Sequence, residues 1–316
     1  MVQGGDCGSI NASLDYSFQL TEPLLGSGSI LAEDIKVGCA PYILSLPQRS
    51  TLPITGGALK LNQLKLSGNE SAMTLNGEVG LAKGFDLSLD GGLYLSSLLP
   101  LMPALDNLRG LLTTKVSLRG PLDDPSFHGS AALSGGEFGI HEPDVEAHKI
   151  AGNFALNGKG ISFEKLTGAV NSGTFEMSGT VLPADPERSS LTARLNQVTI
   201  EPIPDSSITV SGDFRLGTGQ EKRQTLSGDL SIDFAEVKKE FNLNKIIVNA
   251  ISGYFLPSRI KQQASSSSKP MDLDLDVRIH APRNIFVITP FFSAELNADV
   301  RATRSISEPS LDGKME

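Results

Sequence analysis

The chain has no tryptophan, and aromatic residues make up only 6% of its 316 residues. It has two cysteines and four histidines, and 36 acidic residues outnumber 27 basic ones, for a net charge of −9. Without clustered lysine and arginine to neutralise phosphates, we expect no nucleic-acid partner. Cys7 and Cys39 lie outside any CxxC motif, so a metal or redox site is not expected. They form one disulfide in an oxidising compartment or stay as two free thiols.

Long hydrophobic runs are also missing. No run reaches the ~18 apolar residues of a membrane span, and the first residues lack the charged and apolar regions of a signal peptide. The chain stops at Glu316, shortly after Gly313, whereas the matching strand after Gly129 continues through Ala131 and Leu133. We therefore interpret the sequence as part of a longer protein, with targeting and anchoring segments outside it.

Catalytic patterns are scarce. His141 and His148 are seven residues apart but do not form HExxH, and no third metal ligand is obvious. The pair Asp123-Asp124 is explained better by a turn before Pro125 than by acid–base chemistry. Neither a G-x-S-x-G nor a Walker pattern occurs. The sequence thus predicts no enzyme, no cofactor and no catalytic or metal-binding residue.

Glycine, by contrast, is abundant, with 32 residues that fall mostly between short alternating apolar runs. Alternation with period two predicts half-buried β-strands, and the glycines predict tight turns. We expect an all-β fold built as one continuous array rather than as separate domains. Its parts are a leading β segment that is hard to interpret (1–57), a repeated β region (58–260), a flexible Ser-rich loop (261–270) and a β continuation (271–316).

A strand–turn–strand phrase occurs twice, at an offset of 184 residues. Residues 116–129 are V-S-L-R-G-P-L-D-D-P-S-F-H-G, and residues 300–313 are V-R-A-T-R-S-I-S-E-P-S-L-D-G. Val116 matches Val300, Pro125 matches Pro309 and Gly129 matches Gly313. Such repeated units are typical of quasi-one-dimensional β structures.

A second offset, of 102 residues, relates residues 59–93 to 161–195, and Gly77 for example matches Gly179. Local patterns add four predictions. They are a short helix within residues 95–112, limited by Pro100 and Pro103, a hairpin at Gly135-Gly136, a bulge or turn before Val198 where strand parity changes, and a strand over residues 241–248.

Every predicted strand has one aliphatic and one polar face. Two packed sheets would seal the aliphatic faces in a sandwich, whereas an elongated curled antiparallel or mixed sheet would leave a U-shaped aliphatic groove. The steady repeat favours the groove. Its candidate lining residues are Val116, Leu118, Phe154, Leu156, Ile161, Phe163, Phe175, Met177, Leu191, Leu195, Val210, Phe214, Leu230, Ile232, Leu273, Leu275, Val277 and Ile279.

Such a groove would suit acyl chains. Moving an acyl chain of ~14 methylenes into water costs about 11 kcal/mol, at ~0.8 kcal/mol per CH₂. A wall of Leu, Ile, Val and Phe would remove most of that barrier without any chemistry.

The motifs resemble the TamB family (translocation and assembly module subunit) and, more broadly, the AsmA-like bridge proteins of diderm bacteria. The resemblance rests on the phrase from Leu118 to Gly129, on the Leu-Pro-rich residues 98–103 before it, and on residues 272–313. It covers about residues 58–316 and is weakened where Glu308 replaces the Asp of the phrase.

The resemblance implies a periplasmic β-taco with an aliphatic groove, anchored in the inner membrane by an N-terminal helix that this sequence lacks. The implied partners are phospholipid and TamA or another Omp85-type outer-membrane barrel. The implied function is phospholipid transport between the inner and outer membranes. The alternative is a scaffold for the translocation and assembly of outer-membrane proteins, which would use sheet edges for strand addition.

Overall fold

The computed structural model describes most of the chain. The described residues are 8–37, 43–68, 71–102, 105–140, 145–201, 206–219, 223–237, 273–288, 293–306 and 308–316. Several predictions lie outside them, namely the cysteine pair Cys7 and Cys39, His141, the strand over 241–248 and the loop over 261–270.

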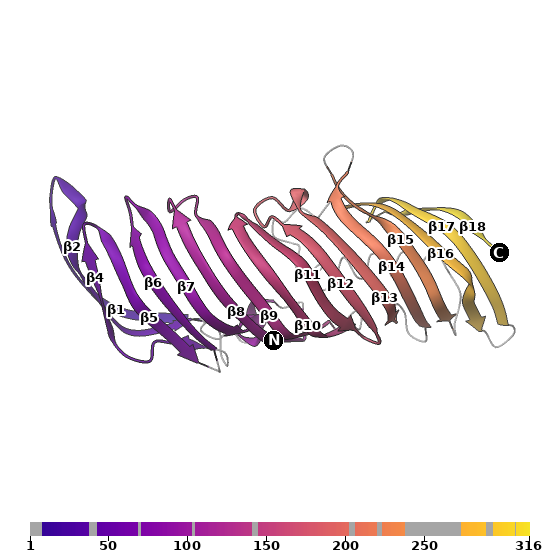
Figure 1. Cartoon of the computed structure of the whole chain (residues 1–316), viewed down its shortest axis with the longest axis horizontal. Coiled ribbons are helices and arrows are strands. Elements are labelled where there is room, and N and C mark those ends of the chain that lie inside the picture. Colours follow the sequence, from indigo (N-terminus) through magenta and orange to yellow (C-terminus); the bar gives the residue numbers. More distant parts are fainter. Residues whose placement is uncertain are drawn as a thin grey trace. The chain divides into compact units, whose positions relative to one another are not determined.

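The described residues form strands and two short 3₁₀ helices. All of these strands belong to one 18-stranded sheet, so the all-β prediction is confirmed and the described part has no second sheet of a sandwich (Figure 1). In chain order the elements are β1 (Gly8–Gln19), β2 (Glu22–Val37), β3 (Leu44–Ser45), β4 (Ser50–Thr55), β5 (Ala58–Gly68), β6 (Ser71–Gly80), β7 (Gly84–Tyr94), η1 (Leu95–Leu101), β8 (Asn107–Gly120), β9 (Ser126–Ile140), β10 (Val145–Gly158), β11 (Gly160–Val170), β12 (Gly173–Val181), η2 (Pro186–Arg188), β13 (Ser190–Ile200), β14 (Ser206–Thr218), β15 (Gln224–Val237), β16 (Leu273–Ile288), β17 (Ser293–Ser305) and β18 (Ser310–Met315).

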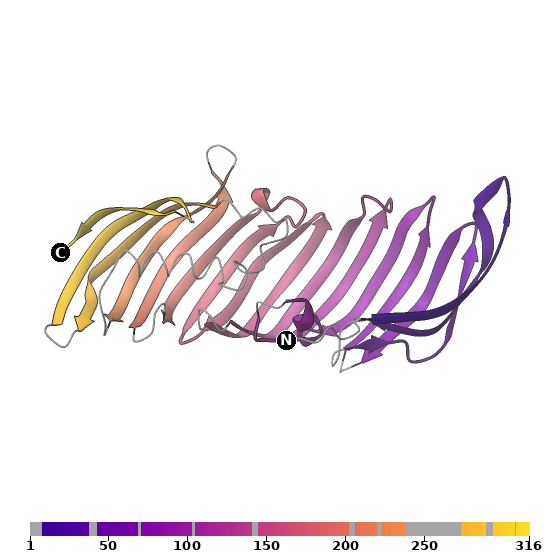
Figure 2. The same cartoon turned by 180° about the vertical axis from the view of Figure 1, so that it is seen from behind.

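The chain forms two compact units, which we describe separately. Unit 1 comprises Met1–Pro103, Leu108–Gly136 and Asn153–Ile161, and unit 2 comprises Ala104–Asn107, Glu137–Gly152 and Ser162–Glu316. In unit 2, strands β12 to β18 pair with their neighbours in chain order, and all of these pairs are antiparallel except the parallel pair β15–β16. These strands lie side by side from both directions of view (Figure 1 and Figure 2). The predicted antiparallel or mixed sheet is therefore confirmed.

Bulges allow a strand to bend while its apolar side chains stay on one face. In β13, Leu195 and Val198 differ in parity but lie on the same face, because the register shifts between them. Gln197 adopts a positive φ of 52° there, and its N–H donates to Ser211 Oγ at 3.0 Å. An extra residue in the left-handed region is a known way to bend a strand. The parity change predicted before Val198 is thus confirmed as a bulge.

The same device recurs in other strands. In β5, Gln63 has a φ of 54° between Leu61 and Leu64, and its N–H donates to Asn76 Oδ1 at 2.9 Å. In β16, Arg283 has a φ of 52° within the register shift between Ala281 and Ile285. In β5 the apolar positions change parity at the bulge, from Leu61 to Leu64, so one apolar face continues through the bend. In β16 the bulge leaves the parity unchanged, and Ala281 and Ile285 are both buried.

The repeated phrase has the same local structure in both copies. A Cβ atom added to Gly129 would lie 2.1 Å from the carbonyl oxygen of Lys115, and one added to Gly313 would lie 2.2 Å from that of Asp299. Both distances are too short for any side chain, so glycine is required where the second strand meets the first. The 184-residue repeat therefore has a steric basis. Arg304, which corresponds to Gly120, shares its positive φ (72° against 110°).

The short helix predicted within residues 95–112 is confirmed as η1 (Leu95–Leu101). Two other sequence predictions need correction. Gly135-Gly136 does not form a hairpin, since β9 continues through it and Gly135 (φ 58°) is only a local irregularity. The match at an offset of 102 residues also needs correction, because the strand pairing after β12 is shifted relative to that of the first copy.

The shift is two residues long. Leu89 pairs with Leu75, whereas its counterpart Leu191 pairs with Gly179 rather than with Met177. The longer connection between β12 and β13 accounts for this difference. A shift of two residues leaves each side chain on its predicted face, because the period of a strand is two.

The bulge in β13 gives a stability prediction. Gln197 is exposed, and its left-handed conformation costs a non-glycine residue about 1 kcal/mol. Gln197→Gly removes this strain and keeps the N–H that bonds to Ser211, so we expect Tm to rise by about 1–2 °C. Gln197→Val, β-branched at the same φ, should lower Tm in the same calorimetric measurement. A lower Tm for Gln197→Gly would contradict this account of the bulge.

Candidate functional site

The apolar side chains of unit 2 form two rows across six neighbouring strands. The pairings of β12 through β17 place the members of each row directly opposite one another. At ~4.8 Å per strand, each row spans about 24 Å. The Phe175 row consists of Phe175, Leu195, Gly212, Leu230, Ile279 and Val300, and the Met177 row of Met177, Ala193, Phe214, Gly228, Val277 and Ala302.

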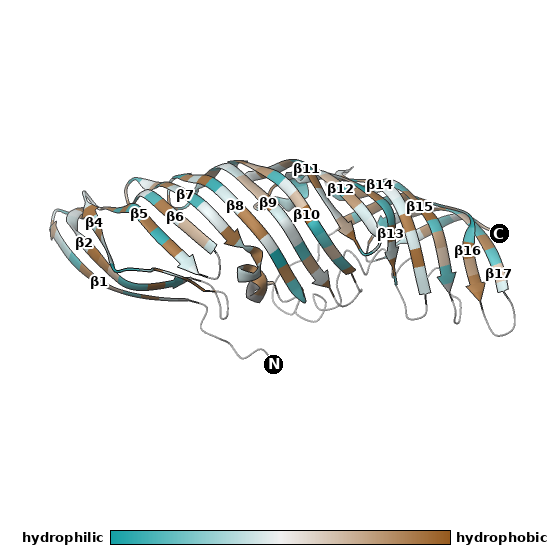
Figure 3. Cartoon of the chain, turned by 60° about the horizontal axis from the view of Figure 1, so that its bottom comes forward, coloured by the Kyte–Doolittle hydropathy of each residue, from teal (hydrophilic) through white to brown (hydrophobic). Residues whose placement is uncertain are grey.

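Large and small side chains alternate along the Met177 row, whereas the Phe175 row has one small residue, Gly212. Gly212 separates Leu195 from Leu230, and Gly228 separates Phe214 from Val277. A large side chain leans over its small neighbour, since a Cβ atom added to Gly212 would lie 3.1 Å from the Phe214 ring. The apolar face therefore has shallow relief. Figure 3 shows the alternation of apolar and polar residues along the strands.

Burial increases along the rows from β12 towards β17. Phe175, Met177 and Leu195 are half-buried. In the same rows, Val277 is 3% exposed and Ile279 1% exposed. The accessible part of the apolar face in unit 2 therefore lies on β12 to β15, next to a fully buried part on β16.

The predicted lining residues of unit 2 divide along this gradient. A buried cluster unites Val210, Ile232 and the four candidates of β16, and Leu195, Phe214 and Leu230 pack against it. Leu191 is half-buried and pairs with Leu216 and Gly179. Phe163 is buried in β11 and lies outside this cluster. The four β16 candidates are Leu273, Leu275, Val277 and Ile279.

The remaining candidates belong to unit 1. Val116, Leu118, Phe154, Leu156 and Ile161 are all half-buried. Val116 and Leu118 pair with Leu89 and Leu87 of β7. Leu87 in turn packs against a buried cluster of Ala32, Leu52, Leu61 and Leu64. Unit 1 therefore has an apolar face of the same construction.

Sequence reasoning missed several residues of these faces. The candidates omitted Leu61 and Leu64 in unit 1, and Ile208 and Ile285 in unit 2, all of them buried. All four residues show the same period-two alternation as their strands. Only between Leu61 and Leu64 does this alternation change parity, at the bulge of Gln63. Ion pairs between strands were also missed, because sequence does not give strand register.

The opposite face of unit 2 is polar and carries a ladder of ion pairs. Asp213 and Asp229 are opposite each other in register, and flanking arginines, Arg194 on one side and Arg278 on the other, offset the repulsion of the two carboxylates. All members are largely exposed, so each pair contributes about 0–1 kcal/mol. The ion pairs are Lys165–Glu176 (3.2 Å), Arg194–Asp213 (2.7 Å), Arg278–Asp299 (3.4 Å) and Arg301–Asp276 (2.7 Å).

A hollow of about 880 Å³ lies among these charges. Its lining includes Asp213, Asp229, Asp276, Arg278 and Arg301. A second hollow, of about 460 Å³, lies at the β16 bulge and is lined by His280 and Arg283 among others. Within the described residues, no group of three or more His, Cys, Asp and Glu side chains is placed to hold a metal ion.

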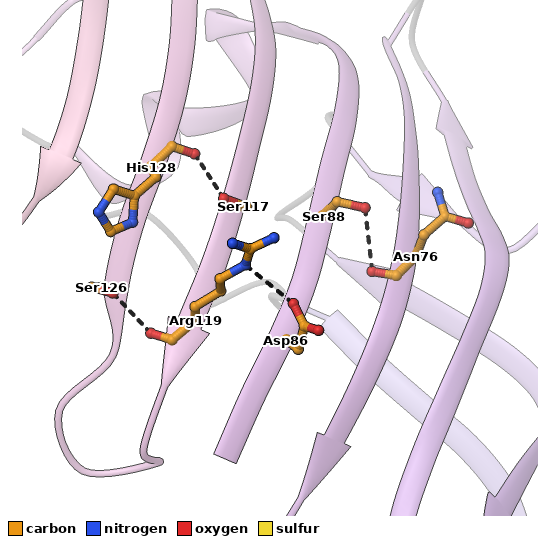
Figure 4. A network of polar contacts seen from close by, with 7 residues as sticks. All are labelled: Asn76, Asp86, Ser88, Ser117, Arg119, Ser126 and His128. Atoms are coloured by element: carbon orange, nitrogen blue, oxygen red, sulfur yellow. Dashed lines mark hydrogen bonds and ion pairs between the residues drawn. The ribbon is translucent and has the colours of Figure 1, made fainter. Parts of the chain in front are cut away.

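In unit 1 the polar contacts also run between strands (Figure 4). Arg119 Nε lies 3.3 Å from Asp86 Oδ1, and the Ser117 hydroxyl donates to the carbonyl oxygen of His128 at 3.1 Å. The Ser126 hydroxyl donates to the carbonyl oxygen of Arg119 at 3.0 Å, closing the turn between β8 and β9. His128 is therefore engaged through its backbone, in keeping with its place in a repeat phrase.

In unit 2, fold and faces together define a class of protein: a β sheet with one aliphatic face and one charged face. Residues 164–316, which contain both apolar rows, match the TamB C-terminal domain. This part of the chain is therefore similar to the C-terminal domain of the TamB family, which supports a role in outer-membrane assembly or transport. No curated protein and no solved structure shows significant similarity to the chain. Among the described residues, no helix is long and apolar enough to cross a membrane.

The ion pair between Asp276 and Arg301 gives a pH prediction. The hydrogen bond from Arg301 lowers the pKa of Asp276 below its ordinary value of 3.8. The pair therefore stabilises the fold above pH 3.8, and the contribution is lost as the pH falls through the lowered pKa. Asp276→Asn should lower Tm by about 1–2 °C at pH 7.

The difference in Tm between the wild type and Asp276→Asn should shrink as the pH falls below 3.8. Thermal denaturation at pH 7 and at lower pH measures it. Arg301→Gln removes the same pair and should follow the same course. A difference in Tm that does not change with pH would mean that the ion pair does not contribute through its charge.

Proposed function

We propose that the apolar face of unit 2 binds the acyl chains of phospholipids. In this function the chain is a periplasmic segment of a bridge that carries lipid between the inner and outer membranes. The proposal includes an inner-membrane anchor outside this sequence, and TamA or another Omp85-type barrel as the partner at the outer membrane. The observation that carries it is the continuous pair of apolar rows on β12 to β17.

The accessible positions of the rows supply the contact surface. Phe175, Met177 and Leu230 are half-buried, so an acyl chain lying on them removes further apolar surface from water. The buried residues of β16, such as Leu275 and Ile279, form the floor beside this surface. A chain of ~14 methylenes costs about 11 kcal/mol to expose to water, and contact with the rows lowers this barrier.

The shallow relief of the rows suits a flexible hydrocarbon. Ala193, Gly228 and Ala302 alternate with large side chains along the Met177 row, and Gly212 interrupts the Phe175 row. The charged face of the same strands stays in water, with its arginines and carboxylates paired. We therefore expect one face to contact lipid and the other to contact solvent.

Photo-crosslinking tests the proposal. A photoreactive phenylalanine at Phe214 should crosslink to phospholipid when the chain is mixed with vesicles. Met177→Arg or Leu230→Arg places a charge in the rows, and we expect either variant to lower the crosslink yield at least tenfold. The cost of burying an unpaired charge beside hydrocarbon is the reason.

Thr174→Arg is the matched control, since Thr174 is exposed and adjacent in sequence to Phe175 on the opposite face of β12. It should leave the yield unchanged. Circular dichroism confirms that each variant keeps its β structure, and Met177→Leu should crosslink like the wild type. Full crosslinking and lipid transfer by folded Met177→Arg would refute the lipid function. Failed assembly of outer-membrane proteins with lipid transfer intact would favour the scaffold function instead.

A further inference from the structure

Four consecutive turn segments of unit 1 lie along one edge of its strands. The β4–β5 turn follows the β1–β2 turn, since Gly57 N–H donates to the carbonyl oxygen of Gly26 at 2.8 Å. The β6–β7 turn comes next, because Gly80 pairs with Ala58 at the start of β5. The β8–β9 turn follows, because a Cβ atom added to Gly84 would lie 2.9 Å from Pro121. Successive hairpins are about 10 Å apart, two strand spacings.

Large apolar side chains are exposed at three of these turns and on the strand ends beside them. Leu20, Leu81 and Leu122 lie in turns, Leu24 and Leu25 near the start of β2 and Phe127 at the start of β9. We call the six residues the leucine rim: Leu20 (92% exposed), Leu24 (52%), Leu25 (52%), Leu81 (66%), Leu122 (39%) and Phe127 (45%). Scattered exposed leucines need no explanation, but a row at neighbouring turns indicates an interaction site.

Turn chemistry does not require these residues. Turns favour Gly, Pro, Asn, Asp and Ser, each for a backbone reason, and a leucine at a turn tip serves none of them. The turn between β12 and β13 in unit 2 shows the ordinary pattern, with Pro183, Ala184, Glu187 and Arg188 exposed. The described turn between β12 and β13 thus lacks the exposed leucines that the turns of unit 1 carry.

The charges beside the rim restrict its partner. Lys83 and Lys159 are engaged in ion pairs, Lys83 with Glu78 at 3.3 Å and Lys159 with Asp124 at 2.5 Å. The other charged residues of these turns, Glu22 and Asp123, are acidic. The rim therefore has no basic excess to attract an anionic surface, which membrane-bound basic segments use.

We propose that the leucine rim inserts into the surface of a zwitterionic lipid bilayer and docks unit 1 there by its turns. Hairpin tips about 10 Å apart would place several apolar side chains in one plane below the headgroups, as an interfacial helix does with its apolar face. This docking does not require acyl chains on the rows of unit 2, so the two proposals can fail separately.

Vesicle flotation of the 316-residue chain tests the docking. With phosphatidylcholine vesicles, the wild type should float, and Leu81→Glu/Leu122→Glu should float at least tenfold less. Ile288→Glu/Met315→Glu is the matched control, because these unit 2 residues are also apolar and 40% and 46% exposed. The control should float like the wild type. Adding anionic phosphatidylglycerol should weaken rather than strengthen binding.

The absence of tryptophan provides an independent readout. Leu81→Trp introduces a single indole at a turn tip, and its emission should shift to the blue on addition of phosphatidylcholine vesicles. Ala184→Trp, at an exposed turn of unit 2, should not shift. Equal flotation of the wild type and the double glutamate variant, no flotation of the wild type, or an unshifted Leu81→Trp emission would each overturn the docking. If Met177→Arg loses lipid crosslinking but floats normally, the docking proposal is supported independently of the acyl-chain proposal.

Discussion

The fold depends on one constraint, that a bent strand must keep its apolar side chains on a single face. Side chains alternate from face to face with period two, so an inserted residue would send the following apolar positions to the wrong side. The chain meets this constraint in sequence and in backbone together. Leu195 and Val198 change parity where Gln197 takes a left-handed conformation, and Leu61 and Leu64 do so at Gln63. Continuous apolar faces, and with them any lipid-binding surface, follow from these local bends.

Polar groups at the bends satisfy the backbone that the bulges release from the ladder. Ser211 Oγ accepts the N–H of Gln197, and Asn76 Oδ1 accepts that of Gln63. Both bends are exposed, so each of these hydrogen bonds contributes about 0.5–1.5 kcal/mol to the stability of the bent strand. The ion-pair ladder of unit 2 serves a different purpose. It makes the second face of the same strands soluble, and its individual contributions are small.

Much of this architecture could be predicted from sequence because its causes are local. The alternation of apolar and polar residues predicted the strands, and the glycines predicted the turns. The parity change before Val198 predicted a bulge, which the structure contains. The hairpin predicted at Gly135-Gly136 was wrong because glycine pairs also occur inside strands. Here the backbone of Gly136 lies so close to Gly110 that a Cβ atom on Gly110 would be 2.8 Å from it. The burial gradient from Phe175 to Ile279 could not be predicted, because it depends on packing between segments distant in sequence. The ion pairs required a register that sequence does not supply. The TamB resemblance was confirmed over residues 164–316.

The alternation of size along the Met177 row has an evolutionary consequence. Gly228 lies between Phe214 and Val277, and Ala193 lies between Met177 and Phe214, so each volume is set by its neighbours and not by its own identity. A mutation that enlarges one position is tolerated when an adjacent strand loses a similar volume. In sheets that descend from one ancestor, substitutions at paired positions should therefore compensate each other. The summed side-chain volume of each pair across the strands is preserved while the individual residues differ. Covariation of side-chain volume between paired positions would then trace the ancestry of such sheets after ordinary sequence identity has faded.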